Sequence, residues 1–287
     1  MADTLGRFEL HLSDAEYPTQ LANAPDPPKR LYGIGDPALL VPGLAVIGSR
    51  KSTPYGRGAA RLFAGWAAAE GVVIISGGAI GCDQAAHRAA LEVNGPTVAV
   101  LGCGADIDYP TGATALLALI RSRGCVLSEQ PWGTPPLRWA FARRNRIIAG
   151  LSHAVLVVEA SVPSGTFSTA DAAADAGRDV LAVPGSIFAP ECRGSNRLIR
   201  QGAMPITEID DLVRALGIDD QCTRHERPDE TPSQSDPLLA ALVANPMRPD
   251  DIAKEFGLTI VDAVRRLSRL EAGGLVSRLS DGRYGRS

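Results

Sequence analysis

Six short apolar runs, separated by longer alanine-rich segments, constrain the fold of this chain more than any other feature. Each run is nearly continuous in valine, isoleucine, leucine or alanine, which is typical of strands covered on both faces. The runs are residues 44–48, 72–76, 97–101, 125–128, 154–159 and 179–183. The segments with helical periodicity between them are 56–70, 82–93, 112–123, 138–150 and 167–176. This alternation predicts an α/β protein with a doubly wound, mostly parallel Rossmann-like sheet.

The remainder of the 287 residues divides into an N-terminal extension, a linker and a second small domain. Residues 218–236 are polar, acidic and aperiodic and contain prolines, so we expect a linker there. Residues 237–287 show three short helical patterns and then two short strands around an Asp-Gly turn, which is the order of a winged helix-turn-helix. We therefore predict an extension packed on the core at 1–40 and a Rossmann-like domain at 41–217.

Composition and cysteine usage exclude several classes of protein. Hydrophobic residues make up 45% of the chain and charged residues 21%, which excludes a disordered or fibrous chain. The five cysteines are widely spaced without a C-x-x-C pair, and the four histidines have no metal-ligand spacing, so we expect no metal, no cofactor and a reducing cytoplasm. No secretory leader and no run of about 18 apolar residues occur, so we expect no membrane association.

The net charge of −3 hides an uneven distribution of charge along the chain. Residues 40–210 carry fifteen basic and thirteen acidic groups, so the excess acid lies in the tails and the linker. Only three of the 29 basic residues are lysines, and arginine suits bidentate phosphate contacts, although a GC-rich genome gives the same bias. The predicted sheet can therefore present a basic surface within an acidic protein.

Small, polar or glycine-rich loops follow four of the predicted strands. Open parallel sheets bind ligands at the carboxyl ends of their strands, and such loops let backbone N–H groups approach an anion. A glycine in one such turn has a purely structural explanation, but four loops in register favour a site. Candidate phosphate contacts in these loops are Gly48, Ser49, Arg50, Lys51, Ser76, Gly77, Gly78, Gly81, Asp83, Ser164, Gly165 and Thr166.

Two of these loops raise specific expectations. Arg50 follows a two-residue turn, so we expect it to clamp a phosphate, with a surface salt bridge as the alternative. Asp83 either contacts the ligand or only caps its helix, and His87, four residues later, could share a hydrogen bond with it that fixes the loop.

The string at 141–148 places an aromatic ring beside three arginines. On a helix, Phe141, Arg144 and Ile148 share one stripe, whereas Arg143 and Arg146 point elsewhere. Burying three arginines against a sheet is costly, so we expect the helix start to meet a polyanion, with a base stacked on Phe141. The alternative is that Phe141 and Ile148 belong to the core and the arginines form a solvated face with local ion pairs.

With these strings assembled, the chain resembles the DNA-processing protein A (DprA, or Smf) family, in a short form with an extended Rossmann domain and a C-terminal winged helix. The matching stretches run in order through residues 17–203. They are YPTQL, DPPKRLYGIG, AVIGSRKSTPYG, ISGGAIGCDQAAH, TVAVLGCGADIDYP, LSEQPWG, FARRNRIIAGLS, SGTFSTADAA, VPGSIF and GSNRLIRQGA.

The resemblance implies a recombination mediator that is not an enzyme. Such a protein binds and protects single-stranded DNA, forms a homodimer and loads RecA in natural transformation. Carried over by position, the loop at 48–50 and the SGGAIGCD loop would contact phosphate and Phe141 would stack on a base. Arg143, Asn145 and Arg146 would line the pocket or hold it in shape, and residues 164–166 would close its rim.

Two other functions remain as alternatives at this stage. A nucleotide phosphoribohydrolase on a related fold would need a glutamate at the position of Thr169, and hydrolysis without that carboxylate is unfavourable. A nucleotide-sensing regulator would depend on the winged helix, where Arg265, Arg266 and Arg269 are bracketed by Asp262 and Glu271. With a net charge of only +1 over residues 232–287, duplex binding and protein contacts are equally open for this segment.

Overall fold

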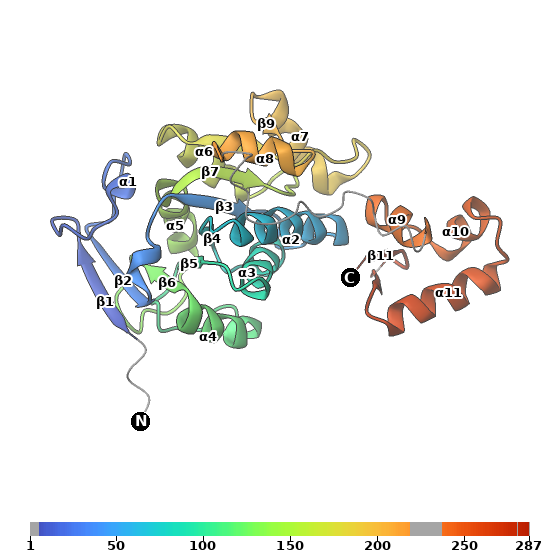
Figure 1. Cartoon of the computed structure of the whole chain (residues 1–287), viewed down its shortest axis with the longest axis horizontal. Helices are drawn as coiled ribbons and strands as arrows, with labels where there is room; N and C mark the ends of the chain where they lie inside the picture. Colours follow the sequence, from blue (N-terminus) through green and yellow to red (C-terminus); the bar gives the residue numbers. More distant parts are fainter. Residues whose placement is uncertain (1–5, 219–236, 280, 287) are drawn as a thin grey trace. The chain divides into compact units, whose positions relative to one another are not determined.

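A nine-stranded sheet forms the centre of the larger unit of the chain (Figure 1). The computed structural model describes residues 6–218, 237–279 and 281–286, which divide into two compact units. The strands of the larger unit are β1 (Arg7–His11), β2 (Arg30–Gly35), β3 (Gly43–Ile47), β4 (Ile74–Ser76), β5 (Thr97–Leu101), β6 (Cys125–Ser128), β7 (Ser152–Val157), β8 (Asp179–Ala182) and β9 (Met204–Pro205). They lie in the order β1-β2-β6-β5-β4-β3-β7-β8-β9, parallel from β6 to β9 and antiparallel at β1 and β2.

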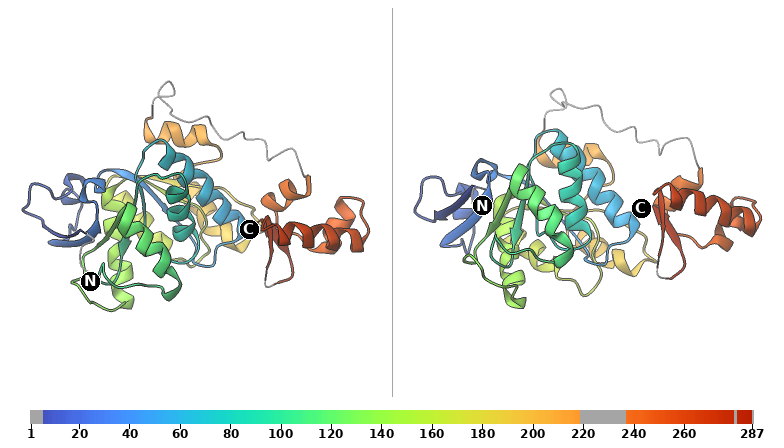
Figure 2. Two further views of the ribbon diagram at one scale, coloured as in Figure 1. Left: turned by 60° about the horizontal axis from the view of Figure 1, so that its bottom comes forward. Right: turned by 90° about the horizontal axis from the view of Figure 1, so that it is seen from below.

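Helices cover both faces of this sheet (Figure 2). They are α1 (Thr19–Ala22), α2 (Pro54–Ala69), α3 (Cys82–Glu92), α4 (Thr114–Arg123), α5 (Arg138–Leu151), α6 (Thr166–Asp175), α7 (Arg193–Arg200) and α8 (Ile209–Leu216). Because alternate side chains of a strand point to opposite faces, Val98 and Val100 of β5 share a buried cluster with residues of α5 and α6, whereas Ala99 and Leu101 share one with residues of α3 and α4. Burial on both faces explains why the six apolar runs lack polar positions.

The predicted doubly wound sheet is confirmed, with differences at its ends. All six apolar runs are strands, but β4 has three residues instead of five and β7 begins two residues early, at Ser152. The segment predicted only as an extension packed on the core adds β1 and β2 to the sheet itself, at one edge (Figure 1). The elements β9, α7 and α8 follow the last predicted strand and were not expected.

The order of the strands creates a crevice at one point of the sheet. From β3 the chain adds β4, β5 and β6 in turn on one side, and it then returns to place β7 on the other side of β3. The loops that leave the carboxyl ends of β3 and β7 therefore diverge toward opposite faces. This is the switch point at which open α/β sheets bind ligands.

The smaller unit has the predicted order of a winged helix-turn-helix. Its elements are α9 (Pro237–Ala244), α10 (Pro249–Glu255), α11 (Ile260–Ala272), β10 (Val276–Arg278) and β11 (Tyr284–Arg286). The two strands pair antiparallel, and Leu238, Ile252 and Leu267 belong to a buried core. All but the first residue of the predicted linker 218–236 lies outside the described residues.

A histidine is buried without charge beside the sheet. His87 of α3 is fully buried, and its Nδ1 lies 2.7 Å from the Thr97 Oγ1. Because the Thr97 hydroxyl donates its own proton to the Ile74 carbonyl at 2.9 Å, it accepts the proton of Nδ1. The expected hydrogen bond between His87 and Asp83 is therefore wrong. Burial, aided by the positive charges of Arg144 and Arg88, lowers the pKa of His87 to about 3.

We expect acid to destabilise the fold through His87. Below pH 6.5, the ordinary pKa of histidine, His87 binds a proton in the unfolded chain, whereas in the folded chain it stays neutral down to about pH 3. The free energy of unfolding therefore falls as the pH falls across this window. Between pH 6.5 and pH 5, urea unfolding of the wild-type protein should lose about 2 kcal/mol more than that of His87→Gln. The exposed His153→Gln is the control and should keep the wild-type pH dependence. An unchanged pH dependence in His87→Gln would contradict this.

Candidate functional site

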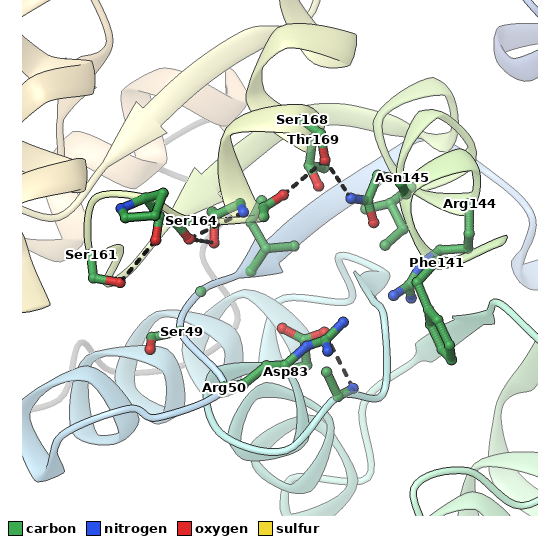
Figure 3. A pocket seen from close by; sticks show the side chains of 18 of the residues that line it. Ser49, Arg50, Asp83, Phe141, Arg144, Asn145, Ser161, Ser164, Ser168 and Thr169 are labelled. Atoms are coloured by element: carbon green, nitrogen blue, oxygen red, sulfur yellow. Dashed lines mark hydrogen bonds between the residues drawn. The ribbon is translucent and has the colours of Figure 1, made fainter. Parts of the chain in front are cut away.

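A pocket of about 480 Å³ opens at the switch point, between the loops that follow β3 and β7 (Figure 3). One face of α5 and the first turn of α6 complete its walls. Its polar and charged lining residues are Ser49, Arg50, Lys51, Asp83, Arg138, Arg144, Asn145, Ser161, Ser164, Thr166, Ser168 and Thr169. The strand ends thus gather here most of the residues that the loop pattern of the sequence predicts.

The loop after β3 is held by its backbone so that Arg50 faces the pocket. Ser49 N–H donates to the Glu159 carbonyl at 2.8 Å, and Lys51 N–H donates to the Ser49 Oγ at 3.1 Å. A Cβ at Gly48 would lie 2.6 Å from the Cys82 Sγ, so only glycine lets this loop approach α3 so closely. The Arg50 guanidinium lies 5.8 Å from the centre of the Phe141 ring, within range of a cation–π contact.

Asp83 fixes the loop after β4. Its carboxylate accepts hydrogen bonds from the Gly77 N–H at 3.1 Å and the Ala79 N–H at 3.4 Å. Burial raises the pKa of this carboxyl, and the charge of Arg144 and the two N–H donors oppose that rise. Asp83 therefore shapes the loop that borders the pocket, which is the structural role that the sequence left open.

Four predicted contacts of this loop do not line the pocket. Ser76 is fully buried and donates to the Val46 carbonyl, and Gly78 is also buried. Gly81 has a φ of +98°, and a Cβ there would lie 2.3 Å from the Ser49 carbonyl, so it shapes the chain. Gly77 lines an adjoining cavity instead. Ser76, Gly78 and Gly81 thus hold or shape the loop and do not line the pocket.

Arg144 brings a buried positive charge to the pocket wall. It is only 5% exposed, its Nη1 donates to the Val100 carbonyl, and its Nε has no hydrogen-bond partner among the described residues. Burial lowers the pKa of this guanidinium to about 10. The negative charge of Asp83 opposes this lowering, and the positive charge of Arg50 adds to it, so Arg144 stays charged at neutral pH. Two guanidinium groups thus point toward the same space (Figure 3), an arrangement that an anion would stabilise.

The third wall joins α5 to the start of α6. The Asn145 Nδ2 donates to the Ser168 Oγ at 2.7 Å, and the Ser168 hydroxyl donates to the Gly165 carbonyl at 2.8 Å. The Ser164 hydroxyl donates to the Thr166 Oγ1 at 2.9 Å. These bonds hold the first turn of α6 against the pocket, and a helix N-terminus favours negative charge.

Arg143 and Arg146 are not among the residues that line this pocket, so of the two expected roles only that of holding the pocket in shape stays a prediction. Both face the other side of α5, because they lie off the helix stripe that carries Phe141 and Arg144. The Arg146 Nη2 lies 2.6 Å from the Glu129 Oε1 and its Nε 2.9 Å from the Asp26 Oδ2, while the Arg143 Nε lies 3.3 Å from the Glu129 Oε2. The structure shows these two arginines in local ion pairs, as the alternative interpretation of the sequence expected.

Several lining residues were missed from the sequence. Arg138 lies on the same stripe of α5 as Phe141, Asn145 and Ile148, so helical periodicity could have found it. Ser161 begins the polar loop after β7 that also carries Ser164, so the strand-end pattern could have found it, whereas Ser168 had no comparable signal. Among the described residues there is no cluster of acids, histidines and cysteines that could hold a metal ion. Within the same part of the chain, no helix is long and apolar enough to cross a membrane.

We expect Asp83→Ala to destabilise the protein strongly. The substitution removes the acceptor of two buried N–H groups and a buried negative charge that offsets the nearby charge of Arg144, which together should lower the free energy of unfolding by about 3 kcal/mol. The exposed Asp171→Ala is the matched control and should stay within about 0.5 kcal/mol of wild type in urea unfolding. A loss below about 1 kcal/mol for Asp83→Ala would show that the carboxylate does not hold the loop.

Comparison with known proteins identifies the family of this chain. The family model for DNA recombination-mediator protein A matches residues 9–217, and that for the DprA winged helix domain matches residues 223–282. Protein Smf of Escherichia coli is 40% identical over 285 residues, which cover 94% of this chain and 75% of that protein.

Two solved structures have the same fold. The X-ray structure of DNA processing protein A from Streptococcus pneumoniae superposes with a TM-score of 0.69 at 38% identity, covering 74% of each chain. DNA processing protein A from Helicobacter pylori, described for its single-stranded DNA binding mode, gives a TM-score of 0.67 at 32% identity, covering 75% of this chain and 98% of that one. The predicted resemblance is confirmed: the chain belongs to the DNA recombination-mediator protein A family, DprA or Smf.

Proposed function

We propose that the switch-point pocket binds single-stranded DNA and that the protein acts through this binding as a recombination mediator. The observation that carries the proposal is the environment of Arg144: its buried guanidinium makes one hydrogen bond to the described part of the protein and lies beside a second guanidinium in an open pocket. A buried charge is costly unless it is paired, and a backbone phosphate would pair both arginines. The Helicobacter pylori relative, described as binding single-stranded DNA, supports the same ligand.

The charge of the pocket favours a polyanion. Among the described residues, its lining holds four basic side chains, Arg50, Lys51, Arg138 and Arg144, against the single carboxylate of Asp83. The local charge is therefore positive although the chain is acidic overall. Phosphates would meet Arg50 and Arg144, with the N–H groups at the start of α6 on the opposite wall.

The aromatic ring in the pocket favours unpaired over paired DNA. Phe141 lines the pocket on the same stripe of α5 as Arg144 and Asn145. Bases of a single strand can turn to stack on such a ring, whereas those of a duplex stay within their own stack. Binding should therefore depend on charge and stacking more than on sequence.

A binding function fits this pocket better than hydrolysis. Asp83 is the one carboxylate of the described lining, and two backbone N–H groups already hold it. Thr169 occupies the position where the phosphoribohydrolase pattern needs a glutamate. A threonine hydroxyl is a poor acid or base at neutral pH, so we propose that the protein is not an enzyme.

We extend the proposal to partners on the basis of family membership. As in the family, the protein would form a homodimer in the cytoplasm, protect incoming single strands and load RecA in natural transformation. The winged helix adds no observation in favour of a regulator. Its Arg265 lies 3.5 Å from Asp262, and Ile260, Val261 and Val264 are exposed on α11, a composition suited to a protein contact.

We expect Arg50→Ala to weaken DNA binding for all sequences alike. Loss of one phosphate contact should reduce the affinity for labelled oligothymidine about tenfold and flatten the slope of log affinity against log salt by about 0.7. Fluorescence anisotropy over a salt series measures both quantities.

Arg143→Ala is the matched control for that experiment, because Arg143 is an exposed arginine of α5 that faces away from the pocket. We expect its affinity and salt slope to match those of the wild-type protein. A larger loss for Arg143→Ala than for Arg50→Ala, or tighter binding to a duplex of the same length, would overturn the assignment of the pocket.

A further inference from the structure

The loop after β8 carries the two most exposed large apolar side chains in the described part of the chain. Ile187 is 77% exposed and Phe188 is 87% exposed, and neither lines the switch-point pocket. Exposed apolar residues are ordinary when they occur singly, whereas two large neighbours indicate a contact surface. We call this loop, residues 183–189, together with Arg193 and Arg197 of α7, the β8 surface.

Hydrogen bonds hold this loop in one shape. The Gly185 N–H donates to the Asn196 Oδ1 at 3.1 Å, and the Asn196 Nδ2 donates to the Gly185 carbonyl at 2.9 Å, so one side chain of α7 binds both polar groups of that residue. The Phe188 N–H donates to the Ser186 Oγ at 3.3 Å. The Phe188 ring therefore stands on an ordered backbone, and a ligand that contacts it has little loop entropy to overcome.

The start of α7 joins this loop to the rim of the switch-point pocket. The Gly194 N–H donates to the Ala160 carbonyl at 2.6 Å, and a Cβ at Gly194 would lie 2.6 Å from the same oxygen, so only glycine allows this close approach. Ala160 directly precedes Ser161, which lines the pocket. Figure 3 shows Ser161 at the opposite end of the pocket from Phe141. The β8 surface therefore continues the pocket at its Ser161 end.

Two arginines on one face of α7 give this surface a positive charge. Arg193 and Arg197 are four residues apart, so they lie on the same side of the helix, and both are exposed. The Arg197 guanidinium lies 5.4 Å from the centre of the Phe167 ring, in the first turn of α6 that forms a wall of the pocket. Neither arginine has an ion pair with a described residue. Residues 183–203 carry three arginines and one acid, Glu191, so the local charge is positive.

We propose that a bound single strand continues from the pocket over the β8 surface, where a base stacks on Phe188 and phosphates meet Arg193 and Arg197. The proposal rests on the proposed binding of single-stranded DNA and extends it to a second group of residues. An exposed ring beside arginines that lack ion pairs is a combination that binds an unpaired strand without reading its sequence. The positive charge favours this polyanion over an apolar protein partner.

Strands of two lengths separate this surface from the pocket. The probes are labelled oligothymidines of about 4 and about 16 nucleotides, the limits of the site sizes found for one domain that binds single strands. The shorter probe occupies the pocket alone, and the longer probe reaches the β8 surface. In fluorescence anisotropy, Phe188→Ala should reduce the affinity for the longer probe about tenfold, because one stacked base is lost. It should leave the affinity for the shorter probe at the wild-type value.

Further variants identify the kind of contact. Phe188→Leu keeps an apolar side chain without a ring, so it should lose affinity for the longer probe as Phe188→Ala does, whereas Phe188→Tyr should retain it. Arg193→Ala combined with Arg197→Ala should flatten the salt slope for the longer probe by about 1.4. Leu119→Ala and Arg123→Ala are the matched controls, because both residues are exposed on α4 and neither lines the switch-point pocket. Both controls should keep the wild-type values at both lengths.

The outcomes separate this inference from the proposed function. Failure of the longer probe to bind the wild-type protein would overturn the proposed function together with the inference. Binding of the longer probe by Phe188→Ala as tightly as by the wild-type protein would overturn only the β8 surface. Wild-type affinity of Phe188→Leu for the longer probe would also overturn it, because the contact would then be apolar and not a stacked base. An equal loss for both probes in Phe188→Ala would do the same, since the effect would not depend on length.

Discussion

The burial of two opposite charges, Arg144 on α5 and Asp83 at the start of α3, is the constraint on which the rest of the site depends. Asp83 uses its carboxylate to hold the N–H groups of the loop after β4, and Arg144 donates to the end of β5 at Val100. Burying such charges is costly unless hydrogen bonds and opposite charges compensate. Hydrogen bonds within the protein compensate Asp83, whereas the one hydrogen bond of Arg144 among the described residues goes to Val100, and we propose that an anion in the pocket supplies the rest of its compensation.

The α/β core could be predicted from the sequence because strands buried on both faces are continuous apolar runs. The edges could not be predicted in the same way. The side chains of β1 are alternately exposed and at least partly buried, because only one face of this edge strand is covered. The strand β9 is two residues long, which is too short for any pattern. The antiparallel addition of β1 and β2 depends on pairing with β6, a contact between segments about 90 residues apart that no local pattern encodes.

The site residues in the loops that follow strands could be predicted from the sequence. The residues of α5 could not, because their contribution depends on which face of the helix carries them. Arg50, Ser164 and Gly165 line the pocket because strand ends of a parallel sheet converge. Arg143 and Arg146 were grouped with Phe141 because they are close in sequence, yet their partners Glu129 and Asp26 come from other segments. Tyr109 was missed because it follows β5 by eight residues in an irregular loop, and only the structure places its ring on Phe141.

The central claim is that the strand-end pocket between β3 and β7 grips the sugar–phosphate backbone through Arg50 and Arg144. A crystal structure of the protein with a short oligothymidine tests this most directly. We predict a phosphate within hydrogen-bond distance of both guanidinium groups, facing the first turn of α6. A backbone that follows Arg143 and Arg146 on the opposite side of α5, with the pocket empty, would contradict it.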